Sequence, residues 1–99
     1  MIHEIAHIQV KPGLQADFER GVADAAALFK RARGCRGMAL QRGIEQPLQY
    51  RLVVAWDSVE DHTVHFRASA DFQAWRGLVG HCFEVAPVVE HVDTVLSPF

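Results

Sequence analysis

The residues best suited to chemistry lie between Trp56 and Arg76, where histidines, aromatic side chains and an arginine recur at helical spacing. His62 and His65 are three residues apart, so a helix would carry them close together on one side. A histidine can move a proton near neutral pH or donate a hydrogen bond to a phenolate. Arg76 can stabilise an anionic oxygen with its permanent charge. We therefore predict His62, His65 and Arg76 as catalytic residues.

Aromatic residues around these groups could form a pocket for a flat aromatic molecule. Trp56 ends an apolar segment, where its indole could stack on such a ligand or anchor the core. His7 and Tyr50, the only tyrosine, lie on predicted strands that could face the same cavity. The predicted substrate-binding residues are Trp56, Phe66, Phe72, Trp75, His7 and Tyr50.

Each of these residues also has a purely structural interpretation. A single histidine on a helix is more often structural than catalytic, and Arg76 could instead form a salt bridge with Asp71 or Glu84. His62 and His65 have spacing that could bind a metal, but no third and fourth ligand follows at suitable spacing. We expect no metal and no cofactor, since a glycine-rich phosphate loop is also missing.

The elements that must position these residues follow from apolar periodicity. Alternation predicts strands over residues 2–10, 35–43, 48–56 and 88–96. Helical spacing predicts one helix from Leu14 to about Gly34 and a second from Val59, interrupted near Ala68. Ser58 and Ser69 are the expected N-caps of the two parts of that second helix. The order β-α-β-β-α-β predicts an α+β, ferredoxin-like fold with a four-stranded antiparallel sheet and both helices on one face.

Length, charge and cysteine content narrow the class of protein. With 99 residues the chain is expected to form a single domain, 1–99. The net charge of −2 and the absence of a basic face argue against nucleic acid as a partner. Cys35 and Cys82 lack a CxxC spacing, and we expect reduced thiols in a cytoplasmic protein. Neither a signal peptide nor a membrane span is predicted.

A sheet with helices on only one side leaves its second face uncovered. In a chain of 99 residues no further element is available to cover it. An apolar sheet face exposed to water would be larger than the patches that monomers normally expose. We therefore predict a homodimer formed through the open sheet face.

Several motifs give the chain a family resemblance over nearly its whole length. They are Ile8-x-Val10-Lys11-Pro12-Gly13, Trp56-x-Ser58-x-Glu60, His65 and Ser69-x-x-Phe72-x-x-Trp75. With these motifs the chain resembles the antibiotic biosynthesis monooxygenase (ABM) family of dimeric α/β-barrel proteins. The resemblance implies a dimer of packed sheet faces, with the C-terminal strand reaching toward the partner.

The resemblance implies several possible reactions, because the same scaffold serves different chemistry. Some members oxidise aromatic polyketides or quinols without metal or flavin. Their pocket has a tryptophan at the position of Trp56, a tyrosine at about His62, an arginine at about Arg76 and an asparagine near Leu52. This chain contains no asparagine, so such a pocket would have a changed set of polar groups.

Three functions therefore remain open. The first is a cofactor-independent monooxygenase that oxidises a phenolic, quinol or polyketide-type aromatic molecule with dioxygen. The second is a haem-binding or haem-degrading protein, although those members resemble a pattern with an asparagine on the first strand, where this chain offers only His3 and His7. The third is a catalytically silent small-molecule-binding dimer, which a pocket filled by Trp56, Phe66 and Trp75 would favour.

Overall fold

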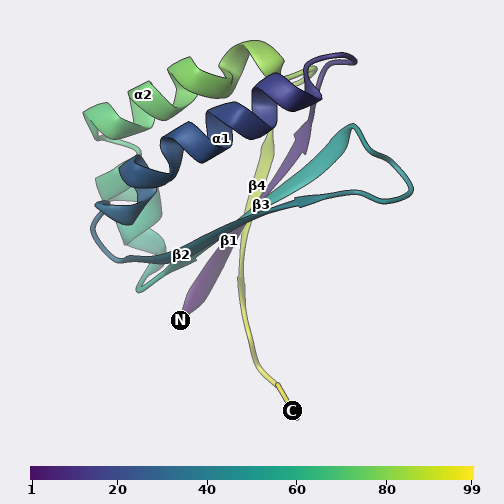
Figure 1. Ribbon diagram of the computed structural model, residues 1–99. Helices are drawn as coiled ribbons and strands as arrows, with labels where there is room; N and C mark the ends of the chain where they lie inside the picture. The colour runs from purple at the N-terminus through teal and green to yellow at the C-terminus, as the bar shows by residue number, and fades with distance from the viewer.

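The computed structural model describes residues 1–99 and places one sheet beneath a layer of helices (Figure 1). The strands are β1 (Ile2–Gln9), β2 (Cys35–Arg42), β3 (Gln49–Trp56) and β4 (Val88–Asp93). The helical segments are α1 (Gln15–Lys30), η1 (Asp61–Phe66), α2 (Ala70–Val79) and η2 (Gly80–Cys82). This order confirms the predicted ferredoxin-like arrangement.

The sheet runs in the order β2-β3-β1-β4 with antiparallel neighbours throughout. Strand β1 is central and pairs Glu4 with Val54 of β3 on one side and with His91 of β4 on the other. Helices α1 and α2 lie side by side on one face (Figure 1). A single chain forms an open sheet and not a closed barrel, so the other face has no covering layer.

Alternation along the strands decides which side chains meet the helices. In β3 the side chains of Tyr50, Leu52, Val54 and Trp56 are buried, while Arg51 is exposed. The same period of two puts Glu4, Ala6 and Ile8 of β1 on the helix-covered face. The predicted alternation in both strands is confirmed.

An aromatic cluster attaches the helical layer to the sheet. The centroid of the Phe29 ring in α1 lies 4.9 Å from the ring centroid of Phe66 in η1 and 5.2 Å from that of Trp75 in α2. Phe66 in turn lies 5.6 Å from Trp56 at the end of β3. Because these edge-on and tilted contacts are buried, they fix η1 and α2 relative to the strand on which they pack.

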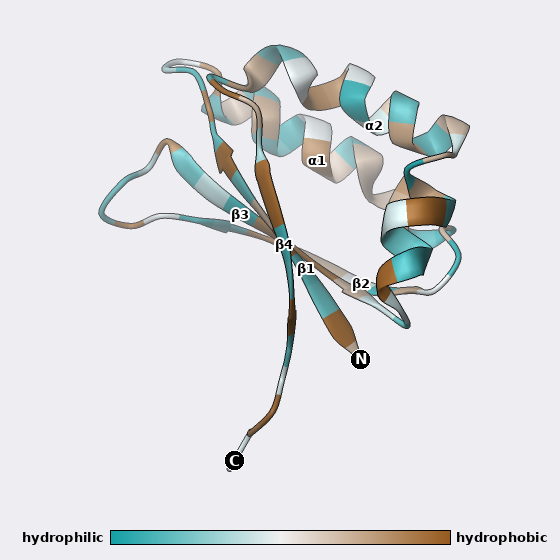
Figure 2. Cartoon of the chain, turned by 180° about the vertical axis from the view of Figure 1, so that it is seen from behind, coloured by the Kyte–Doolittle hydropathy of each residue, from teal (hydrophilic) through white to brown (hydrophobic).

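The C-terminal segment differs from the sequence prediction. Strand β4 ends at Asp93, earlier than the predicted Leu96, because the last residues have no strand beside them to pair with. Figures 1 and 2 show this segment running away from the folded part of the chain, and it exposes Val95, Leu96 and Phe99. None of the helices combines the length and the apolar character needed to cross a lipid bilayer.

Candidate active site

Segment η1 determines which histidine turns inward. Ser58 starts the helical region as predicted, accepting a hydrogen bond on Oγ from the Asp61 N–H at 3.2 Å. The segment is a π-helix, in which the Arg67 N–H donates to the carbonyl oxygen of His62 at 3.1 Å. Single π-helical turns are frequent at functional sites. Within this turn His62 and Phe66 are buried and His65 is exposed, which resolves the orientation that the sequence left open.

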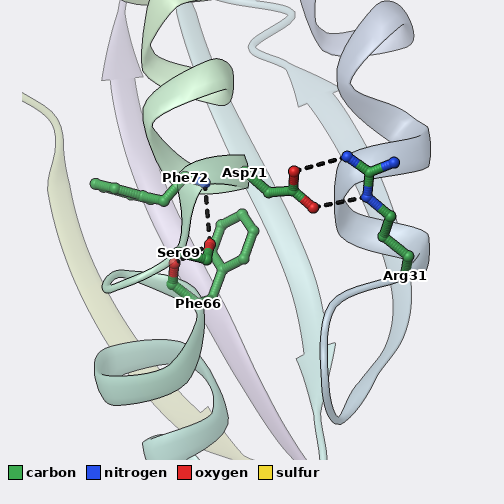
Figure 3. A network of polar contacts seen from close by, with 5 residues as sticks. All are labelled: Arg31, Phe66, Ser69, Asp71 and Phe72. Atoms are coloured by element: carbon green, nitrogen blue, oxygen red, sulfur yellow. Dashed lines mark hydrogen bonds and ion pairs between the residues drawn. The ribbon is translucent and has the colours of Figure 1, made fainter.

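The start of α2 directs two neighbouring side chains to opposite sides. Ser69 caps the helix as predicted, accepting from the Phe72 N–H at 3.1 Å (Figure 3). Asp71 points toward α1, where it accepts two hydrogen bonds of 2.7 Å from Arg31 (Figure 3). Phe72 points the other way (Figure 3), toward the pocket described next. The pair with Arg31 therefore replaces the salt bridge between Asp71 and Arg76 that the sequence suggested.

A pocket of about 370 Å³ lies between the sheet and the helical segments. Strands β1 and β4 line one side of it, and η1, α2 and the segment after η2 line the other. The lining from β1 is Glu4, Ala6 and Ile8. The lining from the helical side includes His62, Arg67, Phe72, Trp75 and Arg76. Aromatic side chains, two arginines and a histidine therefore face the carboxyl group of Glu4 across one cavity.

A line of polar groups crosses the wall of this pocket. The Trp56 Nε1–H donates to Glu4 Oε1 at 3.0 Å. The same oxygen lies 3.4 Å from His62 Nε2, and His62 Nδ1 lies 2.9 Å from Nε2 of His91. Glu4 is only 5% exposed and His62 only 3%. The His62 ring also stacks on the Trp56 indole, with 5.5 Å between ring centroids and 21° between planes. Both nitrogens of His62 therefore have a titratable neighbour.

Burial sets the protonation of this pair. Loss of solvent, followed by the positive charge of Arg67 and then the neighbouring His91, lowers the pKa of His62 to about 4. Burial raises the pKa of the Glu4 carboxyl, although the Trp56 hydrogen bond and the charge of Arg67 oppose that shift. His62 is thus a neutral imidazole at pH 7 beside a carboxyl group that holds its proton more tightly than an exposed one. Such a pair can accept and pass on a proton.

Two guanidinium groups face the same cavity. Arg76 lies with its guanidinium carbon 5.9 Å from the centroid of the Phe72 ring, which keeps it over the pocket. Neither Arg67 nor Arg76 takes part in an ion pair with a carboxylate of this chain. Both positive charges therefore remain available to an anionic ligand.

Of the nine predicted site residues, the structure brings four to this pocket: His62, Arg76, Phe72 and Trp75. Trp56 and Phe66 lie behind its wall, in the core. Trp56 is 0% exposed and is covered by His62, so its indole supports the pocket and has no surface for a ligand. These side chains do not fill the cavity, since about 370 Å³ stays open.

The other predicted residues lie away from this pocket. His65 points to solvent on the outer side of η1. Tyr50 is buried near α1, where its hydroxyl donates to Glu19 Oε2 at 2.6 Å. His7 lies on the open sheet face, with Nε2 3.4 Å from Glu90 Oε1. His7 and Tyr50 both line a different hollow of about 510 Å³ beside the β2–β3 loop. The sequence prediction had therefore assigned residues of two separate hollows to one pocket.

Sequence reasoning did not select Glu4, Arg67 or His91. The signal for Glu4 was its alternation with the inward-facing Ala6 and Ile8, which puts a charged residue on the covered side of the sheet. His91 had a similar signal, because it alternates with Val89, which also turns toward the covered side of the sheet. No comparable signal distinguished Arg67 from the other exposed arginines.

A metal ion or haem would need other groups than those of this pocket. No three His, Cys, Asp or Glu side chains gather anywhere in the chain as a set of metal ligands. For haem, an imidazole nitrogen with no other neighbour would be needed in the pocket. His62 offers no such nitrogen, because its Nε2 atom lies next to Glu4 and its Nδ1 atom contacts His91.

Family comparison agrees with this architecture. The model of a family described as "Antibiotic biosynthesis monooxygenase" matches residues 1–78. This chain belongs to the ABM family. The resemblance seen in the sequence motifs is thereby confirmed, and the fold of the solved ABM structures agrees with the fold described above.

Two relatives and one further structure are similar to this chain. A Bordetella bronchiseptica protein, provisionally described as an antibiotic biosynthesis monooxygenase, is 60% identical with a TM-score of 0.95, over 96% of this chain and 97% of its own. The uncharacterised YczJ of Bacillus subtilis (strain 168) is 34% identical over 96% of this chain and 100% of its own. SnoaB from Streptomyces nogalater, a cofactor-independent oxygenase, has a TM-score of 0.84 at 18% identity, over 98% of this chain and 95% of its own. The likeness to SnoaB is one of fold.

Proposed function

We propose that this ABM-family protein is a cofactor-independent monooxygenase that oxidises a phenolic, quinol or polyketide-type aromatic molecule with dioxygen. The observation that carries the proposal is the pocket in which neutral His62 and the buried carboxyl group of Glu4 lie close to Arg67 and Arg76. Proton acceptors opposite fixed positive charges suit a reaction that begins by forming a phenolate. Family membership supports the same reaction class.

The pocket has the size and lining for a small aromatic ligand. Its volume of about 370 Å³ lies in the range of small-molecule sites. Phe72 and Trp75 offer apolar ring surface on the helical side, and Ala6 and Ile8 offer it on the sheet. A flat ring between these layers would present its hydroxyl group to the polar wall.

The proposed chemistry needs only substrate and dioxygen. Loss of a hydroxyl proton leaves an electron-rich phenolate, which passes one electron to dioxygen. The ring radical and superoxide combine to form a carbon–oxygen bond, and the resulting peroxide takes up a proton. Cleavage of the oxygen–oxygen bond then releases water and leaves a carbonyl group. For anthrone, the enol form reacts in this way, and one anthrone and one dioxygen give one anthraquinone and one water.

The proposed assembly is a homodimer through the open sheet face. On that face Ile5, Val53 and Ala39 form an apolar row across β1, β3 and β2, since their register makes them neighbours. His7 and Arg51 flank this row with polar groups. A second copy would cover this row. The proposal places the protein in the cytoplasm, where Cys35 and Cys82 remain free thiols.

Product analysis with isotopically labelled dioxygen tests this proposal. Metal-free protein is incubated with anthrone or a hydroquinone, and the product is examined by mass spectrometry. Labelled anthraquinone formed faster than in a reaction without protein supports monooxygenation. Failure to accelerate oxidation of any substrate of this class contradicts it, and a Soret shift on adding haem would point to the haem-binding alternative.

A further inference from the structure

We propose that Glu4 receives the substrate's proton and that His62 and His91 exchange it with solvent, so that the three residues act as a proton relay. This inference rests on the proposed oxidation and adds the identity of the proton acceptor and of the outlet. It concerns Glu4 and His91, which the family resemblance did not indicate.

The first step of the argument is the geometry of Glu4. Its Oε1 atom accepts from Trp56 and lies 3.4 Å from His62 Nε2. Oε2 makes no hydrogen bond within the chain and is not sealed from the pocket. His62 has neighbours at both nitrogens, so it offers no nitrogen to a substrate. Glu4 Oε2 is therefore the group at which a hydroxyl proton can arrive.

The second step is the outlet. His91 lies on β4, an edge strand of the sheet, and is half-buried, whereas Glu4 and His62 are almost fully buried. Its Nε2 atom lies 2.9 Å from His62 Nδ1, a distance at which one nitrogen donates and the other accepts. His91 is therefore the member of the line that can exchange a proton with water.

The relay balances with each group passing one proton. With Glu4 in its protonated form, which burial favours, the substrate hydroxyl gives its proton to Oε2 while Oε1–H gives its proton to His62 Nε2. His62 Nδ1–H then protonates His91 Nε2, and His91 releases the proton on Nδ1 to water. When the peroxide formed with dioxygen needs a proton, the same transfers run in reverse. The reverse movement restores the starting tautomers, so the relay is ready for the next substrate.

The surrounding charges favour a relay over storage of a proton. Arg67 is the positive group whose charge acts on both Glu4 and His62. It disfavours a long-lived imidazolium, so a proton that reaches His62 is passed on. Burial raises the pKa of the Cys35 thiol of β2. The thiol is therefore no competing acceptor at neutral pH.

Chemical rescue separates this relay from a structural role. Wild type, His91→Ala and Glu4→Gln are compared for anthrone-dependent oxygen uptake with increasing imidazole in the buffer. We expect His91→Ala to lose about 10-fold or more of the rate and to regain it with imidazole, because imidazole replaces the lost outlet. Glu4→Gln keeps the acceptor for Trp56 and the side-chain volume, and we expect a similar loss without rescue. His81→Ala, which removes an exposed histidine outside the pocket, is the matched control and should match wild type.

A second measurement tests the contact without relying on activity. Nitrogen NMR should detect a scalar coupling between His62 Nδ1 and His91 Nε2 through their hydrogen bond. The coupling, together with rescue of His91→Ala, supports the relay. Absence of the coupling overturns it, as does full activity of His91→Ala in a wild-type background that oxidises anthrone. If wild type itself does not accelerate oxygen uptake, the proposed function fails.

Discussion

Burial gives His62 a different chemistry from that of an exposed histidine. Its ring lies between the Trp56 indole, Glu4 and His91, and its solvent exposure is 3%. An imidazolium in this position would lose its hydration and would lie near the charge of Arg67. The neutral form is therefore favoured through most of the physiological pH range, which keeps the ring available as a proton carrier.

We predict that His62 titrates at about 4 in an NMR pH titration of the folded protein. Replacing Arg67 by methionine should raise this pKa, because it removes a positive charge that disfavours the imidazolium. Arg20→Met, at an exposed position of α1, is the matched control and should leave the titration unchanged. A His62 that titrates near its ordinary value of 6.5 would contradict the burial argument.

The same shift predicts a pH dependence of stability. Because the folded-state pKa lies below the unfolded value, the contribution of His62 is fully present above pH 6.5 and is lost as the pH falls toward about 4. The loss is at most about 3 kcal/mol in free energy of unfolding. The raised pKa of Glu4 acts in the opposite sense, contributing stability at acidic pH that is lost as the pH rises through its folded value. Urea titrations of wild type and His62→Gln between pH 7 and pH 4 isolate the contribution of the histidine to the free energy of unfolding. An equal pH dependence of that free energy in both proteins would refute this prediction.

At the scale of elements, the turn between α1 and β2 fixes the start of η1. Gly34 has φ of +76°, and a Cβ atom there would collide with the carboxylate of Asp61, the first residue of η1. The Oδ1 atom of Asp61 also lies 3.5 Å from Nε of Arg33 in the same turn. The turn therefore leaves room for η1 only because residue 34 has no side chain. His62, the next residue, depends on this contact for its position.

We predict that Gly34→Ala lowers the free energy of unfolding by about 1–3 kcal/mol, because it combines an unfavourable φ with a steric clash. Gly77→Ala, in α2 where a Cβ atom would meet nothing, is the control and should be neutral or stabilising by up to about 1 kcal/mol. Urea denaturation followed by circular dichroism measures both. Equal stability changes in the two variants would argue against the tight contact at Gly34.

The elements themselves could be predicted because each has a periodic signal. Alternation identified the buried face of β3, and Ser58 and Ser69 marked the two helix starts. The phase of η1 could not be predicted, because its π-helical hydrogen bond depends on packing against the sheet. For the same reason the sequence could not separate His62 from His65.

The candidate site could be predicted only in part. Phe72, Trp75 and Arg76 follow from helical spacing after the Ser69 cap, and they do line the pocket. Glu4 was missed because a glutamate in a strand is expected to face water, and only tertiary packing supplies its Trp56 partner. Tyr50 was included as a strand residue that could face a cavity, yet it lies at the opposite end of β3 from Trp56.

At the scale of the whole molecule, the sheet has one covered and one open face. Ile5, Val53 and Ala39 align across the open face by register. The exposed C-terminal segment adds Val95, Leu96 and Phe99 to the apolar surface of the chain. Closed homodimers commonly cover such a surface with the same patch of a second copy.

We predict that the wild-type protein has twice the mass of the 11.1 kDa chain in size-exclusion chromatography with light scattering. Val53→Asp should shift it to the monomer, because the substitution would bury a carboxylate in the interface. Ala27→Asp, at an exposed position of α1, should remain dimeric. A monomeric wild type, or a Val53→Asp variant that stays dimeric, would contradict assembly through this face.

The most direct test of the proposed function is oxygen uptake by the purified, metal-free protein with anthrone, comparing wild type, His62→Ala and His65→Ala. The pocket predicts uptake above the uncatalysed rate in wild type and a loss of about 100-fold in His62→Ala. It predicts a much smaller effect for His65→Ala, since that side chain points to solvent. Wild-type uptake that persists in His62→Ala would contradict the assigned pocket, and no uptake by wild type on anthrones or hydroquinones would contradict the oxidation itself.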